Sequence, residues 1–115
     1  MHARHFLEPD ETGLVIFTHG PNFIRYDEAR GTSGEWQVNP NRTVDRVIIY
    51  VRDEPAATNK IYLATYDKTR PSSQVGRYFI DLLHIQYAGT TEVNWYEFAG
   101  EGQNPFRYVQ AESKL

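Results

Sequence analysis

The fold is decided by residues 34–53, GEWQVNPNRTVDRVIIYVRD. The first half is rich in Gly, Asn and Pro and predicts turns, whereas the second half alternates as a strand. In that strand, predicted over 44–52, Val47, Ile49 and Val51 share one face, and Ile48, Tyr50 and Arg52 share the other. Both faces carry apolar residues, so we expect this strand to be the best core strand of the domain.

Working outward, short apolar runs separated by turn residues predict further strands. They lie at 13–18, 60–66, 76–88, and in two short segments at 93–99 and 105–109 that are either strands or a final helical turn. Residues 22–30 read as a short helix or an irregular turn. Strands 44–52 and 60–66 are expected to form a hairpin. In 76–88 the apolar phase slips by one residue between Leu82 and Leu83, which indicates a β-bulge or a strand buried on both faces, with a helix as the alternative.

These patterns predict a mainly β protein, with α+β as the alternative. The architecture is expected to be a small curved sheet or a β-barrel of about five or six strands with little helix. The domain would span 13–110, with an N-terminal arm at 1–12 and a C-terminal tail at 111–115.

Composition excludes several classes of function. The chain has 115 residues, no Cys and a net charge of −3, so thiolate metal sites and cysteine nucleophiles are excluded. The acidic balance argues against a general basic nucleic-acid binder, although nine of the twelve cations are Arg. No apolar run approaches the ~20 residues of a membrane span, and the N-terminus lacks a signal-peptide core. We therefore expect a cytoplasmic protein with no membrane partner.

Catalytic and metal motifs are missing from the sequence. No two of the four His residues have the spacing of metal ligands on one predicted strand or helix. The segment GTSG at 31–34 is not a phosphate-binding loop, and the sequence contains no nucleophile elbow. The expectation is no metal, no cofactor and no catalytic residue, with an enzymatic role less favoured than a binding role.

The order of the segments GEWQV, VDRVIIY, KIYLATY and GRYFIDLLHIQY resembles the PUA-like superfamily, in particular its EVE and ASCH domains, over roughly residues 14–100. The resemblance implies a small barrel with a central aromatic pocket that holds a flipped, modified base or recognises RNA. Two departures stand out. Val44-Asp45 replaces a frequent Gly-Asp pair, and the Lys and Glu that some ASCH proteins use in catalysis have no counterparts here.

A base pocket needs aromatic rings for stacking, amides for the base edge and arginines for the flanking phosphates. The candidate pocket residues are Asn22, Phe23, Tyr26, Trp36, Asn39, Tyr50 and Trp95, and the candidate phosphate ligands are Arg25, Arg30 and Arg42. Tyr62 and Tyr66 are expected to share the pocket side with Tyr50. Each has a structural alternative: core packing for both Trp residues, turn formation for Asn39, cross-strand pairing for the tyrosines, and pairing with nearby acids for the arginines.

The leading interpretation is a non-enzymatic nucleic-acid-binding module, for DNA or RNA, with a pocket for a single base. The alternative is a protein-interaction or structural subunit, for example a homodimer joined by exposed aromatics. A small ASCH-like hydrolase is the third hypothesis. It requires a buried Lys or carboxylate at a pocket floor, for which the candidates are Lys60, Asp45, Asp81 and Glu97.

Overall fold

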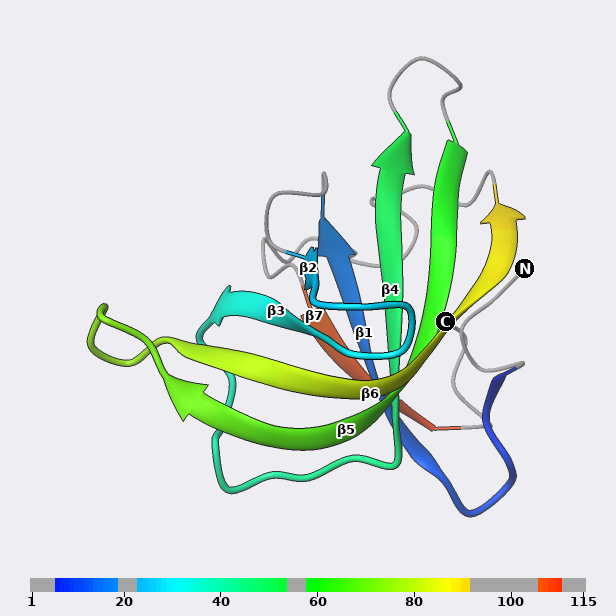
Figure 1. Ribbon diagram of the computed structural model, residues 1–115. Helices are drawn as coiled ribbons and strands as arrows, with labels where there is room; N and C mark the ends of the chain where they lie inside the picture. Colours follow the sequence, from blue (N-terminus) through cyan, green and yellow to red (C-terminus); the bar gives the residue numbers. More distant parts are fainter. Residues whose placement is uncertain (1–5, 19–22, 54–57, 92–105, 111–115) are drawn as a thin grey trace.

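The computed structural model describes residues 6–18, 23–53, 58–91 and 106–110, and its strands form one seven-stranded mixed sheet (Figure 1). The strands are β1 (Thr12–Thr18), β2 (Phe23–Arg25), β3 (Gly31–Trp36), β4 (Arg46–Asp53), β5 (Thr58–Pro71), β6 (Tyr78–Thr91) and β7 (Phe106–Gln110). Their order across the sheet is β2-β3-β6-β5-β4-β1-β7. None of the described residues lies in an α-helix, and the prediction of a mainly β protein is confirmed.

Strand β4 lies between a parallel neighbour, β1, and an antiparallel neighbour, β5. It pairs in parallel with β1, with Val15 opposite Ile48, and antiparallel with β5, with Ile48 opposite Leu63. The predicted hairpin of 44–52 with 60–66 is therefore confirmed. The parallel β1–β4 pair requires a crossover, and the intervening chain supplies it by placing β2 and β3 at the other end of the sheet.

The long strands β5 and β6, 14 residues each, curl as they cross the sheet (Figure 1). Their pairing shifts register three times, and each shift bends and twists the strands. At one of them His84 has a φ of 53°, in the left-handed region that non-glycine residues seldom adopt. The slip predicted between Leu82 and Leu83 thus corresponds to a real bulge, one residue further along.

The sheet buries apolar side chains on both of its faces. On the face that we call inner, Val47 and Ile49 of β4 join a cluster that includes Leu14, Trp36 and Ile80. On the opposite, outer face a second, smaller cluster is formed by Val15, Phe17, Ile48, Tyr50, Ile61 and Val109, with Phe6 and Leu7 packed against it. The predicted alternation along β4 is therefore confirmed.

The sheet remains open. Within the described ranges β2 pairs only with β3 and β7 pairs only with β1, so the strands do not close into a barrel. The predicted number of five or six strands is too low, because β2 and β3 occupy the region where a helix or turn, and then a Trp-bearing turn segment, were expected. The predicted segment at 105–109 is a strand over its described residues, as part of β7 (Phe106–Gln110), whereas the predicted segment at 93–99 lies outside the described residues.

Candidate nucleic-acid interface

The sheet separates two residues that the sequence places in one pocket. Trp36 belongs to the inner cluster and Tyr50 to the outer cluster. Tyr50 is fully buried, and its ring stacks on Phe17 with the centroids 5.0 Å apart. Burial raises the pKa of its hydroxyl far above the ordinary value. A pocket that contains both rings is therefore not formed, and Tyr62 and Tyr66 lie on the face opposite to Tyr50.

Trp36 is a core residue at the end of β3, where it pairs with Tyr78 of β6. Only 5% of its surface is exposed, and its Nε1 donates a hydrogen bond to Ser33 Oγ over 2.9 Å. Ser33 lies three residues earlier, on the far side of a β-bulge that turns both side chains toward the core. The indole therefore presents no face on which a base can stack.

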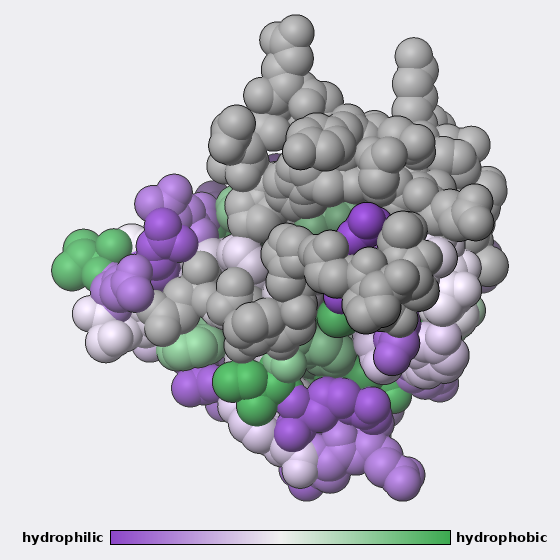
Figure 2. Space-filling model, turned by 90° about the horizontal axis from the view of Figure 1, so that it is seen from above, coloured by the Kyte–Doolittle hydropathy of each residue, from purple (hydrophilic) through white to green (hydrophobic). Residues whose placement is uncertain are grey.

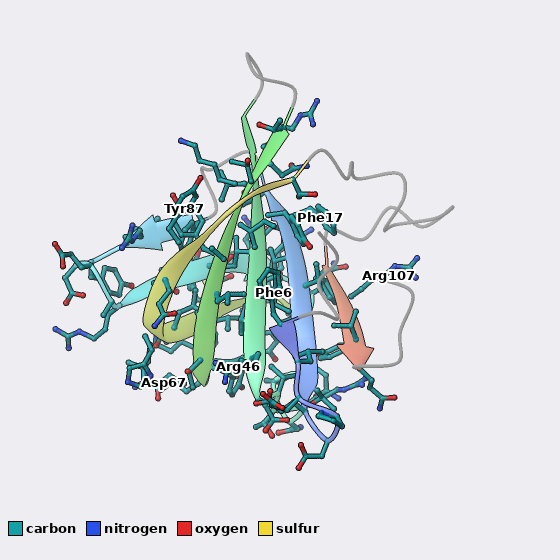
Figure 3. All side chains as sticks on the ribbon, turned by 90° about the vertical axis from the view of Figure 1, so that its right-hand side faces the viewer. Phe6, Phe17, Arg46, Asp67, Tyr87 and Arg107 are labelled. Carbon is teal, nitrogen blue, oxygen red and sulfur yellow. The ribbon has the colours of Figure 1, made fainter. Side chains whose placement is uncertain are left out.

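Three aromatic rings meet at the inner face near strand β2, and we call Phe23, Tyr62 and Tyr87 the aromatic row. The Phe23 and Tyr62 ring centroids are 5.2 Å apart, and those of Tyr62 and Tyr87 are 5.5 Å apart, both pairs tilted by 56°. Tyr62 and Tyr87 are register partners on β5 and β6. Figure 3 shows Tyr87 beside strand β2.

The contact between Phe23 and Tyr62 depends on the curvature of the sheet. Strand β2 is separated from β5 by β3 and β6 in the strand order, which would place the two side chains about 14 Å apart in a flat sheet with strands ~4.8 Å apart. Because the sheet curls, Phe23 instead meets Tyr62 across the concave side. Phe23 and Tyr62 are half-buried, whereas 56% of Tyr87 is exposed. The aromatic row therefore begins with half-buried rings beside the inner cluster and ends at the surface with Tyr87.

Two cations accompany the aromatic row. The Arg25 guanidinium lies 5.7 Å from the centroid of Tyr62, and its Nη2 donates to the carbonyl oxygen of Glu28. Lys60 is exposed and precedes Tyr62 by two residues on β5, so its side chain leaves the same face of the strand. Aromatic rings with an arginine and a lysine beside them are the side-chain types that surfaces for single-stranded nucleic acid use.

The turn after β2 holds two further predicted residues away from the aromatic row. Tyr26 is 61% exposed and lies on the opposite side of β2 from Phe23 and Arg25, where its hydroxyl is 3.5 Å from Arg70 Nη2. Arg30 forms an ion pair with Asp27 at 3.0 Å. Hydrogen bonds from the backbone N–H groups of Ala29 and Arg30, together with the Arg30 side chain, hold the pKa of Asp27 below its ordinary value of 3.8.

Asn39 and Arg42 lie in the segment between β3 and β4. The Asn39 side-chain oxygen accepts a hydrogen bond from the Asn41 backbone over 2.9 Å, and the Arg42 N–H donates to the Asn39 carbonyl. This arrangement is an Asx turn. The Arg42 guanidinium lies 3.6 Å from the ring centroid of Tyr108 on β7. The three predicted phosphate ligands therefore have three different environments and do not line up as one track.

Sequence reasoning and structure overlap at part of this interface. Phe23 and Arg25, both sequence candidates, each contact Tyr62, while Asn22 and Trp95 lie outside the described residues. Tyr87 was not among the sequence candidates. The sequence contains a pattern that could have suggested Tyr87, because the slip after Leu82 puts Ile85 and Tyr87 on one face. That Tyr87 pairs with Tyr62 follows only from the register of β5 and β6.

The groups proposed for a hydrolase do not meet at one buried position among the described residues. Lys60 is exposed, and exposed Asp45 accepts a hydrogen bond from the Thr12 N–H over 2.8 Å. Asp81 lies on the outer face, away from the aromatic row, with its Oδ2 bound to Arg70 Nε at 2.7 Å. Of the four candidates, Glu97 is outside the described residues. The other three do not form a buried floor beneath the row.

Comparison with known proteins gives no family assignment, since no family model, curated protein or solved structure matches the chain. The resemblance to PUA-like domains accordingly stays a prediction. Across the described ranges, no helix has the length and apolar character needed to cross a membrane.

Proposed function

We propose that this protein is a non-enzymatic, cytoplasmic module that binds single-stranded nucleic acid, DNA or RNA, through the aromatic row. The observation that carries the proposal is the contact of Phe23, Tyr62 and Tyr87 beneath the Arg25 guanidinium. Bases stack on aromatic side chains, and each such contact contributes roughly 1–3 kcal/mol of binding. The surface replaces the predicted Trp36 pocket as the place where a base, modified or not, would be held.

Single strands suit this surface better than duplexes. In a duplex the faces of the bases are stacked on one another, whereas a single strand leaves them free for protein rings. With a net charge of −3 the protein offers little long-range attraction for phosphates. Arg25 and Lys60 would instead act locally, as phosphate contacts beside the stacked bases.

The test is a titration of fluorescently labelled 12-nucleotide single strands, as DNA and as RNA, at ~20 mM salt, followed by anisotropy. Tyr87→Ala is expected to weaken binding about 5- to 100-fold, because it removes one stacking ring. Tyr87→Phe is the matched control and should bind within about two-fold of the wild type, since the ring is kept. Equal affinity for all three proteins, or no saturable binding by the wild type, would contradict the proposal.

The alternative, a protein-interaction subunit or homodimer, is favoured by one specific observation. Ile24 of edge strand β2 and Tyr26, which directly follows that strand, are 51% and 61% exposed. Exposed aromatic and aliphatic residues at an edge strand are typical of protein interfaces. Sedimentation equilibrium of the wild type and of Ile24→Ser distinguishes this function, because a dimer that dissociates in the variant would support it.

A further inference from the structure

The outer face of strands β2, β3, β6 and β5 carries a second set of cations that the aromatic row does not use. Four residues that are paired from strand to strand lie side by side across this face: Ile24 on β2, Thr32 on β3, Asp81 on β6 and Lys68 on β5. Arg70 lies two residues after Lys68 and pairs with Phe79, so both cations leave β5 on the same side. Figure 2 shows hydrophilic side chains gathered toward the end of the molecule where the β5–β6 turn lies.

Three contacts fix the orientation of the Arg70 guanidinium. Its Nε donates to Asp81 Oδ2 over 2.7 Å, its Cζ lies 5.3 Å from the Phe79 ring centroid, and its Nη2 is 3.5 Å from the Tyr26 hydroxyl. The Arg70 side chain is nevertheless 43% exposed, whereas that of Asp81 is only 14% exposed. The guanidinium is therefore preorganised while part of it faces solvent. Planar arginine groups held in this way are well suited to phosphate oxygens.

Lys68 adds a second cation to this surface. It is exposed and lies opposite Asp81 in the register. Lys68 and Arg70 contribute two positive charges, while Asp81 and the exposed Asp67, which precedes Lys68 on β5, contribute two negative charges. A phosphate that approaches this face meets one fixed guanidinium and one mobile ammonium.

Strand β2 links this face to the aromatic row. It has only three residues, and among the described strands it pairs with β3 alone. The Arg25 side chain of β2 points toward the aromatic row, while the side chain of Tyr26, the residue after β2, points toward Arg70. A chain of nucleotides that crosses this short edge strand can therefore contact both faces of the sheet.

We propose that Arg70 and Lys68 form a phosphate-binding pair for the strand whose bases stack on the aromatic row, with the nucleic-acid backbone passing over β2. This inference rests on the proposed function. It adds the course of the nucleic-acid backbone, from the aromatic row over β2 to Arg70 and Lys68. A single strand long enough to cross β2 is the required ligand, so short oligonucleotides should use the aromatic row alone.

The experiment measures the affinity for labelled 12-nucleotide oligothymidylate as a function of salt concentration. For single strands, the slope of log K against log salt changes by about 0.7 for each phosphate contact. Lys68→Gln is expected to reduce the slope by about this amount. Arg70→Lys should keep the slope but weaken binding several-fold, because the charge remains and the planar fork is lost. Lys68 is exposed, so its variant is expected to fold normally.

The matched control is Arg107→Gln, which removes one charge from the other edge strand, β7, where Figure 3 shows Arg107 projecting away from the sheet. Its slope and affinity should equal those of the wild type. The inference is overturned if Lys68→Gln and Arg70→Lys both behave like the wild type while Tyr87→Ala still loses affinity, an outcome that leaves the proposed function intact. It is also overturned if these variants instead dissociate a protein dimer in sedimentation equilibrium. Absence of any binding by the wild type would contradict both proposals together.

Discussion

Trp36 is the residue whose position most changes the interpretation of the interface. Its indole is buried in the inner cluster and donates to Ser33 Oγ, so we expect it to stabilise the fold without contacting nucleic acid. Trp36→Phe should lower the free energy of unfolding by about 1–3 kcal/mol, through the lost hydrogen bond and the smaller ring. Urea denaturation measures this loss. Oligonucleotide affinity should stay within about two-fold of the wild type, and a large loss of affinity in a folded variant would show that the indole takes part in binding.

Asp27 predicts a pH dependence of the turn that follows β2. Its pKa lies below 3.8 in the folded protein because its carboxylate accepts hydrogen bonds from the Ala29 and Arg30 amides. A lowered pKa means that the carboxylate stabilises the turn fully above pH ~4 and that this contribution is lost as the pH falls through the folded value. The amide chemical shifts of Ala29 and Arg30 should therefore titrate with a midpoint below 3.8, and Asp27→Asn should abolish that titration. A midpoint at or above 3.8 would contradict the assignment.

Residue identity alone predicts the role of some of these side chains and not of others. Asn39 in Asn-Pro-Asn forms the turn that its chemistry favours. Tyr50 and Trp36 both suit a base pocket chemically, and only the pairing of β4 with its neighbours shows that they face opposite sides of the sheet. Tyr87 becomes a candidate only when the register with Tyr62 is known.

Among the strands, β2 is the element on which the interface depends most, and Gly31 determines its position. A Cβ at Gly31 would lie 2.5 Å from the carbonyl oxygen of Ile24, so Gly31→Ala must displace β2. We expect a loss of about 1–3 kcal/mol in stability together with weaker oligonucleotide binding, since Phe23 and Arg25 move with the strand. Thermal unfolding and anisotropy measure the two effects.

Gly13→Ala is the matched control for that substitution. The nearest atoms to its added Cβ are the side-chain ends of Leu7 and Val109, at 3.1 and 3.2 Å, which can shift more easily than a backbone carbonyl. Gly13 lies on β1, away from β2 in the strand order, so its variant should keep wild-type affinity. Equal affinity of the two variants would show that the position of β2 is unimportant for binding.

At the level of elements, local pattern predicts strands and hairpins well. The alternation of 44–52, the hairpin with the next strand and the bulge after Leu82 are all visible in the sequence. The parallel pairing of β1 with β4 is not visible in the sequence. These two strands are neighbours in the sheet, but β2 and β3 lie between them along the chain. Strand β2 itself, with three residues, is too short to give a periodic signal.

For the whole molecule, curvature is the property that creates the candidate interface. Bulges in β5 and β6 curl the sheet until β2 stands over β5, and only then do Phe23, Tyr62 and Arg25 meet. The sheet stays open at β2 among the described strands, with Arg25 on one side of this edge and the Tyr26 hydroxyl, 3.5 Å from Arg70 Nη2, on the other. Curvature results from three register shifts along the two long strands, so the sequence predicts a curved sheet but not which side chains it brings together.

The most direct test is an NMR titration of the wild-type protein with 12-nucleotide oligothymidylate that follows the ring protons of Tyr62 and Tyr87. We predict saturable shifts of these resonances and intermolecular nuclear Overhauser effects between the tyrosine rings and thymine protons, because stacked rings lie in van der Waals contact. The buried Trp36 indole N–H should show no such contact. Unchanged Tyr62 and Tyr87 resonances at saturating oligonucleotide would contradict the proposal that the aromatic row binds nucleic acid.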